Sequence, residues 1–279
     1  MGERYFILGG DQDGRVSEVL GLDKVKPLDA GELVISEADA RRVAEARDKA
    51  AAAQGRGRTL VIGRGKASLR GARRVGKTVG DRGFTAAVAR DGGHLYVHYQ
   101  VDSPHPLTSA IADPRRVFKG GNALDIQVAT DPDADPDRKT PAAGDVRLLV
   151  TQQADRTLAV LYRPKVAGFT GEPIVFSSPT GSESFDAIEV VSDRIALEHE
   201  ATATGFVATV SIPLELIGLK LTAGTPLRMD VGYIFGNAPG STAALRAYWS
   251  NNSFTANIIN DVPNESRLEP VQWGTAVVE

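Results

Sequence analysis

From residue 84 to the end of the chain, apolar side chains recur with a period of two in short runs. Gly, Pro, Asp or Asn interrupts almost every gap between these runs, as is typical of antiparallel strands joined by turns. The pattern predicts a mainly β fold, namely an antiparallel two-sheet β-sandwich of jelly-roll or immunoglobulin-like type. Only residues 213–219 (PLELIGL) indicate a helix, of at most two turns. The predicted strands are residues 84–89, 95–101, 123–130, 146–151, 158–162, 174–177, 188–191, 195–199, 206–212, 227–235, 245–249 and 275–278.

The first 80 residues differ in composition from the rest. Residues 5–8 form a short apolar strand, and residues 37–53 are rich in Ala, Arg and Glu, which predicts a solvent-facing helix. Residues 63–83 are rich in Gly, Arg and Lys and are interpreted as a linker. We therefore expect a small α+β or extended segment over residues 1–80, followed by the β-sandwich over residues 81–279.

The overall composition excludes several classes of protein. Apolar residues make up 42% of the chain, charged residues 24%, and the net charge is −3, which is ordinary for a soluble globular protein and predicts no nucleic-acid surface. No apolar run is long enough to cross a bilayer, and residues 1–4 (MGER) do not begin a signal peptide. We expect either a cytoplasmic protein or a fragment whose leader lay upstream. The absence of cysteine excludes disulfides and thiolate chemistry.

Residues 71–78 (GARRVGKT) have the spacing of a phosphate-binding loop. Such a loop needs a strand leading in and a helix leading out, so that backbone N–H groups cradle the phosphates. The apolar strand before it, residues 59–62, ends nine residues too early, and a Gly-rich charged stretch follows. We interpret the segment as a basic flexible linker and expect no nucleotide to bind there.

Two features could in principle serve a metal or a cofactor. The loop from Asp131 to Asp137 (DPDADPD) alternates carboxylates, which resemble calcium ligands, but it lacks the glycine and terminal Glu of an EF-hand. The favoured interpretation is a rigid, solvated hairpin loop. Met229 could be an axial haem ligand, although core packing is the commoner role. We expect no cofactor, with calcium at this loop and haem at Met229 kept as alternatives.

The histidines do not indicate catalysis. His94 and His98 share one face of a predicted strand but are roughly 13 Å apart along it, too far for one metal ion. No Ser–His–Asp order stands out, although spacing alone does not exclude a triad. We predict that the chain is not an enzyme and has no metal site.

Trp249 ends a predicted strand beside Arg246, Asn251 and Asn252. Aromatic faces stack on the apolar faces of sugar rings, while Arg and Asn side chains donate directional hydrogen bonds to hydroxyls. Alternation instead places Trp249 on the same face as Ala247, which favours a core position. The sequence leaves two interpretations open, a sugar-binding platform at these residues and a core tryptophan.

Several segments in the last 200 residues resemble a known family. Residues 84–101 (FTAAVARDGGHLYVHYQV) are similar to the opening hairpin of family 9 carbohydrate-binding-like modules, and residues 118–131 (FKGGNALDIQVATD) to the next signature of that family. Asn122 stands where the family usually has Asp, and Asp125 where it usually has Glu. Residues 206–219 (FVATVSIPLELIGL) resemble the family's strand that ends in a Pro-initiated helical turn. Arg246, Trp249 and the pair Trp273 and Gly274 complete the set.

The resemblance implies an antiparallel β-sandwich related to the haem- and sugar-binding domains of extracellular redox proteins. It implies a non-catalytic carbohydrate-binding module, often part of a larger secreted protein, and hence an extracytoplasmic location with neighbouring domains. The rival predictions are a haem-binding electron-transfer domain and a purely structural or interaction module. The predicted ligand-binding residues are Trp249, Arg246, Asn251, Asn252, Asn122 and Asp125.

Overall fold

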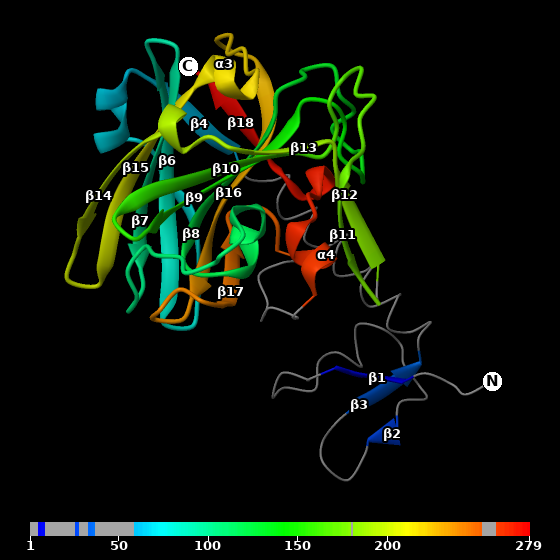
Figure 1. Ribbon diagram of the computed structural model, residues 1–279. Coiled ribbons are helices and arrows are strands. Elements are labelled where there is room, and N and C mark those ends of the chain that lie inside the picture. Colours follow the sequence, from blue (N-terminus) through cyan, green and yellow to red (C-terminus); the bar gives the residue numbers. More distant parts are fainter. Residues whose placement is uncertain (1–4, 9–25, 28–32, 37–58, 180, 253–260) are drawn as a thin grey trace. The chain divides into compact units, whose positions relative to one another are not determined.

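The computed structural model describes residues 5–8, 26–27, 33–36, 59–179, 181–252 and 261–279 (Figure 1). The chain divides into two compact units, Met1–Ala50 and Ala51–Glu279. In the first unit, β3 (Leu33–Ser36) pairs antiparallel with both β1 (Tyr5–Leu8) and β2 (Lys26–Pro27). The strand predicted over residues 5–8 is confirmed. The helix predicted over residues 37–53 lies outside the described residues.

In the second unit, thirteen of the described strands form one sheet. Its order is β13-β10-β9-β8-β16-β18-β4-β6-β7-β15-β14, with β17 on β16 and β5 on β6, while β11 and β12 form a separate hairpin. In chain order the strands are β4 (Thr59–Arg64), β5 (Val75–Val79), β6 (Arg82–Asp91), β7 (His94–Asp102), β8 (Ala123–Ala129), β9 (Asp145–Gln153), β10 (Arg156–Arg163), β11 (Ile174–Ser178), β12 (Gly181–Phe185), β13 (Ala187–Val190), β14 (Ala196–Ala201), β15 (Gly205–Pro213), β16 (Pro226–Gly236), β17 (Ala243–Tyr248) and β18 (Gly274–Val278).

Short helices occupy the connections. They are η1 (Lys66–Arg70), η2 (Pro114–Lys119), η3 (Ser192–Arg194), α3 (Leu214–Ile217), α4 (Val262–Ser266) and η4 (Pro270–Gln272). The helix predicted over residues 213–219 is confirmed as α3, and it ends at Gly218 because that residue adopts a left-handed conformation with φ of 72°. Within the described residues no helix has the length and apolar character needed to span a membrane.

The predicted mainly β fold is confirmed, but the large sheet is mixed rather than antiparallel throughout. β4 lies between β18 and β6 and runs parallel to both, whereas every other pairing among the described strands is antiparallel. Parallel neighbours need a crossover connection between them. The chain supplies one between β4 and β6, where η1 and β5 intervene.

The sheet curls so that its two halves face each other across a central core (Figure 1). Val97 and Tyr99 of β7 belong to the same core as Leu148 and Val150 of β9, although β7 and β9 are not neighbours in the sheet. The Tyr99 hydroxyl crosses this core and donates to the backbone carbonyl of Asp125 on β8 at 3.0 Å. The curled sheet thus forms the two layers expected of a β-sandwich.

A second core lies on the other side of β8, β9 and β10. It is covered by η2, by the β11–β12 hairpin and by the segment that contains α4 and η4. Phe118, Tyr162, Phe176 and Phe185 meet there edge to face, with ring centroids 5.2 to 6.0 Å apart. Trp273 is fully buried in the same core and donates from Nε1 to the Gln127 side chain at 2.8 Å.

The linker predicted over residues 63–83 is wrong, because β4 and β5 belong to the large sheet and η1 lies between them. β5 contains Gly76 and Lys77 of the phosphate-loop-like segment and pairs antiparallel with β6. A Cβ on Gly76 would come to 2.1 Å from the Phe84 carbonyl oxygen, so only glycine allows this close pairing. Since the segment is a strand and no helix follows it, its backbone does not form a phosphate cradle.

Candidate ligand-binding site

The structure buries most of the predicted ligand-binding residues and does not gather them in one site. Asn252 alone among the six is partly exposed. The other five, each at most 2% exposed, are Trp249, Arg246, Asn251, Asn122 and Asp125.

Trp249 follows β17, and its ring lies in the central core. A Cβ on Gly274 of β18 would come to 2.5 Å from the Trp249 ring, which shows how closely that strand packs on the indole. The Trp249 backbone N–H donates to the Val231 carbonyl at 2.9 Å. The prediction of an exposed sugar platform at Trp249 is therefore wrong, and the core interpretation is correct.

Asp125 and Arg246 belong to a buried network of charged groups. Arg147 donates to Asp125 from Nη2 at 2.7 Å and from Nε at 3.1 Å, and the Tyr248 hydroxyl donates to Asp125 at 2.7 Å. Arg246 donates from Nη2 to the Glu265 carboxylate at 3.0 Å and also binds the Glu265 carbonyl. Because Glu265 lies in α4, these contacts fasten the α4 segment to the sheet. Neither Asp125 nor Arg246 is available to a ligand.

Burial and neighbouring charges together shift the pKa values in this network. It lowers the pKa of Arg246 below its ordinary value. Burial also opposes the charge on Arg147, but the adjacent Asp125 carboxylate outweighs it and the pKa of Arg147 is raised. Burial, together with Asp125, raises the pKa of the Tyr248 hydroxyl. The carboxylates of Asp125 and Glu265 are thus paired with arginines of the chain itself.

The predicted asparagines also serve the fold. Asn122 accepts from the Gly236 backbone N–H at 2.9 Å, and the Asn251 amide donates to Glu269 at 3.1 Å. Asn252 accepts from Lys77 at 2.7 Å. Burial and these bonds contradict the prediction that Asn122 and Asn251 face a sugar, whereas Asn252, which is partly exposed, stays a prediction.

Neither cofactor alternative is tested by the structure. Met229 is fully buried in the central core, and haem at Met229 stays a prediction. The loop from Asp131 to Asp137 joins β8 to β9 as the hairpin predicted from the sequence. Its Asp131 and Asp135 carboxylates accept from backbone N–H groups two residues later, at 3.0 and 2.9 Å. In the described ranges no three His, Asp or Glu side chains gather as a metal site, and calcium at this loop stays a prediction.

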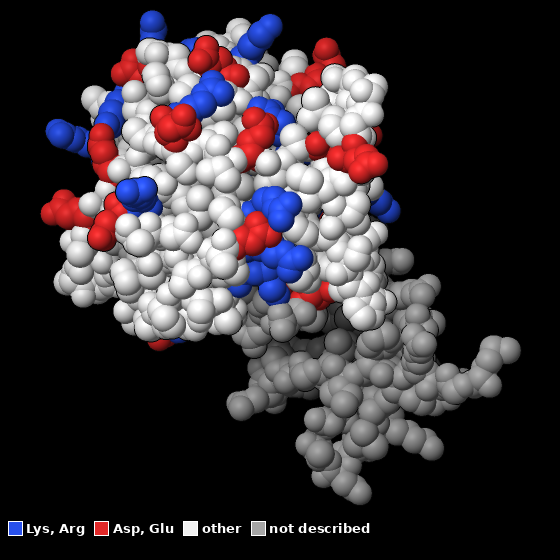
Figure 2. Space-filling model, viewed as in Figure 1, with Lys and Arg blue, Asp and Glu red and all other residues white. Residues whose placement is uncertain are grey.

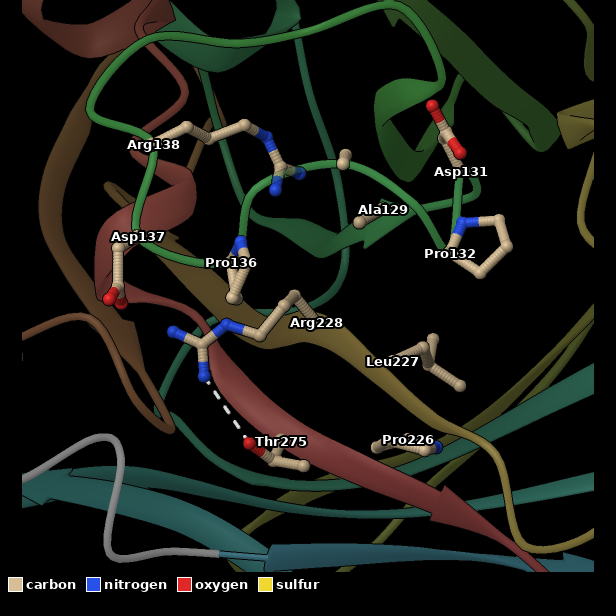
Figure 3. Close-up of a pocket in the computed structure, with 11 residues that line it drawn as sticks. Ala129, Asp131, Pro132, Pro136, Asp137, Arg138, Pro226, Leu227, Arg228 and Thr275 are labelled. Carbon is tan, nitrogen blue, oxygen red and sulfur yellow. Dashed lines mark hydrogen bonds between the residues drawn. The ribbon is translucent and has the colours of Figure 1, made fainter.

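This loop forms one wall of a pocket of about 420 Å³ (Figure 3). The opposite wall comes from the start of β16 and from β18. Figure 3 shows Pro132 and Pro136 on the loop side, and Leu227 and Arg228 on the strand side. The lining residues are Ala129, Asp131, Pro132, Ala134, Pro136, Asp137, Arg138, Pro226, Leu227, Arg228 and Thr275. Of these, sequence reasoning singled out only the residues of the Asp131 to Asp137 loop.

Internal bonds fix the loop beside the pocket. Arg138 donates from Nε to the buried Asp145 carboxylate at 2.9 Å and from Nη1 to the Asp135 carbonyl at 2.6 Å. Its guanidinium carbon lies 6.0 Å from the Trp273 ring centroid. Across the pocket, Arg228 donates to the Thr275 hydroxyl at 3.3 Å. The site therefore combines exposed carboxylate acceptors, a partly exposed cationic donor and apolar carbon surfaces.

No protein-family model and no curated protein sequence matches the chain. Among solved structures it is similar to a family 9 carbohydrate-binding module from Caldicellulosiruptor kristjanssonii in complex with glucose. The identity is 12%, the match covers 80% of this chain and 96% of the module, and the TM-score is 0.46. The cellotriose complex of that module gives the same TM-score of 0.46 with 94% of its chain covered. A protein from Bacteroides uniformis is 13% identical, with 80% and 99% of the two chains covered and a TM-score of 0.46. Family 9 modules, which the sequence segments resemble, are thus among the solved structures similar to this chain.

Proposed function

We propose that this chain is a non-catalytic carbohydrate-binding module and that the pocket beside the Asp131 to Asp137 loop receives the sugar. The observation that carries the proposal is the mixture of groups in that pocket. Sugar hydroxyls need hydrogen-bond partners at fixed directions, whereas the C–H faces of a sugar ring pack on apolar side chains. The resemblance of three sequence segments to family 9 modules supports the same ligand class.

Five of the lining residues supply the contacts in this proposal. Asp131 and Asp137 accept hydrogen bonds from hydroxyls, and Arg228 donates to hydroxyl or ring oxygens. Pro136 and Leu227 supply carbon surface for the ring face. The volume of about 420 Å³ falls within the range of roughly 300–1,000 Å³ that is usual for small-molecule sites.

The family resemblance also supports a setting for the module. We place it outside the cytoplasm, next to other domains of a larger protein that acts on or adheres to polysaccharide. Fractionation of the producing cells checks this directly. Recovery of the protein only from the cytoplasmic fraction contradicts the location without bearing on the pocket.

The test of the binding function is calorimetric titration of the whole chain with neutral saccharides, starting with glucose and cellotriose, and a neutral glycan array. The informative variant is Arg228→Gln, with Arg156→Gln as the matched control. Arg156 is exposed at the start of β10 and does not line the pocket. Loss of a charge-assisted hydrogen bond, worth about 1.5–3 kcal/mol, should weaken binding by about tenfold or more.

Melting temperatures of all three proteins show whether the variants are folded. Unchanged affinity in folded Arg228→Gln moves the site away from this pocket. A wild-type protein that binds no neutral or acidic saccharide contradicts the carbohydrate-binding function itself. Release of reducing ends from a bound polysaccharide contradicts its non-catalytic character.

A further inference from the structure

A second groove lies on the opposite part of the sheet, where η1 crosses the outer faces of β6 and β7. Leu69 and Ala72 pack there on Ala87 and Ala89 of β6 and on Tyr96 of β7. The groove between these elements has a volume of about 630 Å³. Its lining residues are Lys66, Ala67, Leu69, Arg70, Arg74 and His98.

The segment with η1 is held in place by local bonds. Gly65 precedes η1 with φ of 83° and donates its N–H to the Arg90 carbonyl at 2.8 Å. The Lys66 N–H donates to the Asp91 carboxylate at 3.2 Å. The cationic side chains of η1 and the following turn are therefore carried by backbone that is fixed to β6.

The groove collects positive charge that the protein leaves largely uncompensated. Among the described residues neither Arg70 nor Arg74 has an ion-pair or hydrogen-bond partner, and both are exposed. Lys66 pairs with Glu198 of β14 at 3.0 Å, but this pair is open to solvent and contributes little. Two guanidinium groups thus remain to bind an external anion, with the planar fork geometry that matches carboxylate and sulfate oxygens.

His98 forms part of the groove wall and is set up to respond to an anion. Its Nδ1 lies 2.9 Å from the Thr209 hydroxyl of β15. Burial and then the charge of Arg74 lower the pKa of His98 below 6.5. The charged groups around it are Arg74, Arg70 and Lys66 from the η1 side and Glu198, which pairs in register with Thr209, from β14. A bound anion offsets the Arg74 charge and favours the protonated imidazole.

An aromatic ring stands beside these charges. Tyr96 lies two residues before His98 and so on the same face of β7, and it is partly exposed. The Lys66 ammonium is 5.4 Å from the centroid of the Tyr96 ring. An aromatic ring that packs on η1, together with the cationic side chains of the groove, suits a sugar that bears an acidic substituent.

We propose that the η1 groove binds an oxyanion, the carboxylate or sulfate group of an acidic polysaccharide or the same anion free in solution. Binding of an oxyanion is inferred from the groove residues alone, whereas the inference that the anion belongs to a polysaccharide rests on the proposed carbohydrate-binding function. Nucleic acid is the less suitable partner, because the chain carries a net charge of −3. Figure 2 also shows acidic and basic side chains interspersed over the face drawn, rather than a broad basic surface.

The experiment titrates the full chain at low salt with an oligogalacturonate, with sodium sulfate, with cellotriose and with a single-stranded oligonucleotide. The variants are Arg74→Gln and Arg70→Gln, with Arg156→Gln as the matched exposed control and Arg228→Gln as the marker of the other pocket. We expect each groove variant to weaken oligogalacturonate binding by about tenfold and to leave cellotriose binding unchanged. Salt should weaken the acidic ligand only.

The outcomes separate the two sites. Sulfate binding that depends on Arg74, without oligogalacturonate binding, supports the oxyanion site and overturns its polysaccharide source. If no protein, wild type included, binds cellotriose while the wild type binds oligogalacturonate, the neutral-sugar pocket is contradicted and the oxyanion site is not. Arg74-dependent binding of the oligonucleotide in preference to oligogalacturonate overturns the ligand class. Equal affinity of the acidic ligands for wild type and both groove variants overturns the site.

A pH series gives a readout that a structural role would not move. Acidic ligands should bind more tightly as the pH falls below 6.5, because His98 gains a proton while a carboxylate stays ionised down to about pH 4. His98→Gln should remove this dependence and keep the affinity measured at high pH. A series that is identical in wild type and His98→Gln excludes the imidazole from the site.

Discussion

Gly274 lies directly against the indole of Trp249, so that a methyl group on its Cα would come to 2.5 Å from the ring carbon Cη2. The two residues belong to different parts of the sheet, since Gly274 begins β18 and Trp249 follows β17. Both Trp249 and the neighbouring side chains of β16 are buried. The Trp249 ring therefore packs in the core, and position 274 requires glycine because the ring leaves no space for a Cβ there.

Gly274→Ala should destabilise the fold, because the added methyl group must displace a ring that cannot move freely in a packed core. The expected loss is about 1–3 kcal/mol for overpacking. Trp249→Ala should lose about 3–5 kcal/mol through the cavity that it leaves. Chemical denaturation of each variant measures both changes.

The double variant tests the contact itself. With the ring removed, the methyl group of Gly274→Ala falls into the space left behind, so the two losses should sum to more than the loss of the double variant. Gly71→Ala is the control, since nothing lies within 4 Å of a Cβ there. Strict additivity would show that the two residues do not compete for the same space.

Arg147→Met should cost about 3–5 kcal/mol, because it leaves the Asp125 carboxylate buried without its cation. Arg147 and Asp125 are at most 1% exposed, and their nearest atoms are 2.7 Å apart. Joining Asp125→Asn to Arg147→Met should restore part of the loss, since the remaining group is neutral. The exposed ion pair of Lys66 and Glu198 provides the control, and Lys66→Met should change stability by less than about 1 kcal/mol. Urea unfolding of the four proteins gives the comparison.

Strands whose faces differ in exposure were predictable from the sequence. In β15, buried and partly exposed residues alternate along the whole strand, and the period-two pattern identified it. β5 and β12 were missed because they are short edge segments, VGKTV and GSESF, in which Gly and polar residues fill most positions. β5 is recognisable only in the folded structure, where Gly76 presses against the Phe84 carbonyl.

The location of the candidate site was less predictable, for a reason visible in β17. Alternation correctly placed Trp249 on the face opposite Arg246 and Tyr248. Both faces are nevertheless buried, because α4, which follows β17 in the chain, covers the polar face. The pocket was also hard to predict from the sequence. Arg228 and the Asp131 to Asp137 loop are about ninety residues apart in the chain, and only the loop carried a recognisable motif.

The stability of the fold should fall as the pH rises from about 4 to about 7. Asp230 is fully buried, and burial raises its pKa from 3.8 to about 7, against the opposing effect of backbone N–H donors. In this interval the folded protein keeps a proton that the unfolded chain has lost, so deprotonation opposes folding. The contribution is fully present below about pH 4 and is lost above about pH 7, and it amounts to roughly 2–4 kcal/mol.

Asp230→Asn should remove this part of the pH dependence. It should also lose about 1–3 kcal/mol at low pH, because an amide offers only one oxygen to the three N–H donors of Val231, Ser250 and Asn251. Denaturation midpoints at several pH values measure both effects. Parallel curves for wild type and variant between pH 4 and pH 7 would assign the pH dependence to other groups.

The anchor of the pocket loop can be loosened without touching the pocket. Asp145 is buried, binds Arg138 and accepts from the Ala142 N–H at 2.8 Å, but it does not line the pocket. Asp145→Asn removes the charge that holds Arg138 while keeping an acceptor for Ala142. Amide exchange over residues 131–137 should become faster, while the strands on either side keep their protection.

If the loop forms a wall of the sugar site, the same variant should bind neutral saccharides several-fold more weakly, because ordering the loop then opposes binding. Asp155→Asn, in the exposed turn between β9 and β10, is the matched control and should leave both properties unchanged. The two measurements belong together. Faster exchange with unaltered affinity would show that the loop is anchored as described but that sugar contacts lie elsewhere, whereas slow exchange in Asp145→Asn would show that Arg138 is not what holds the loop.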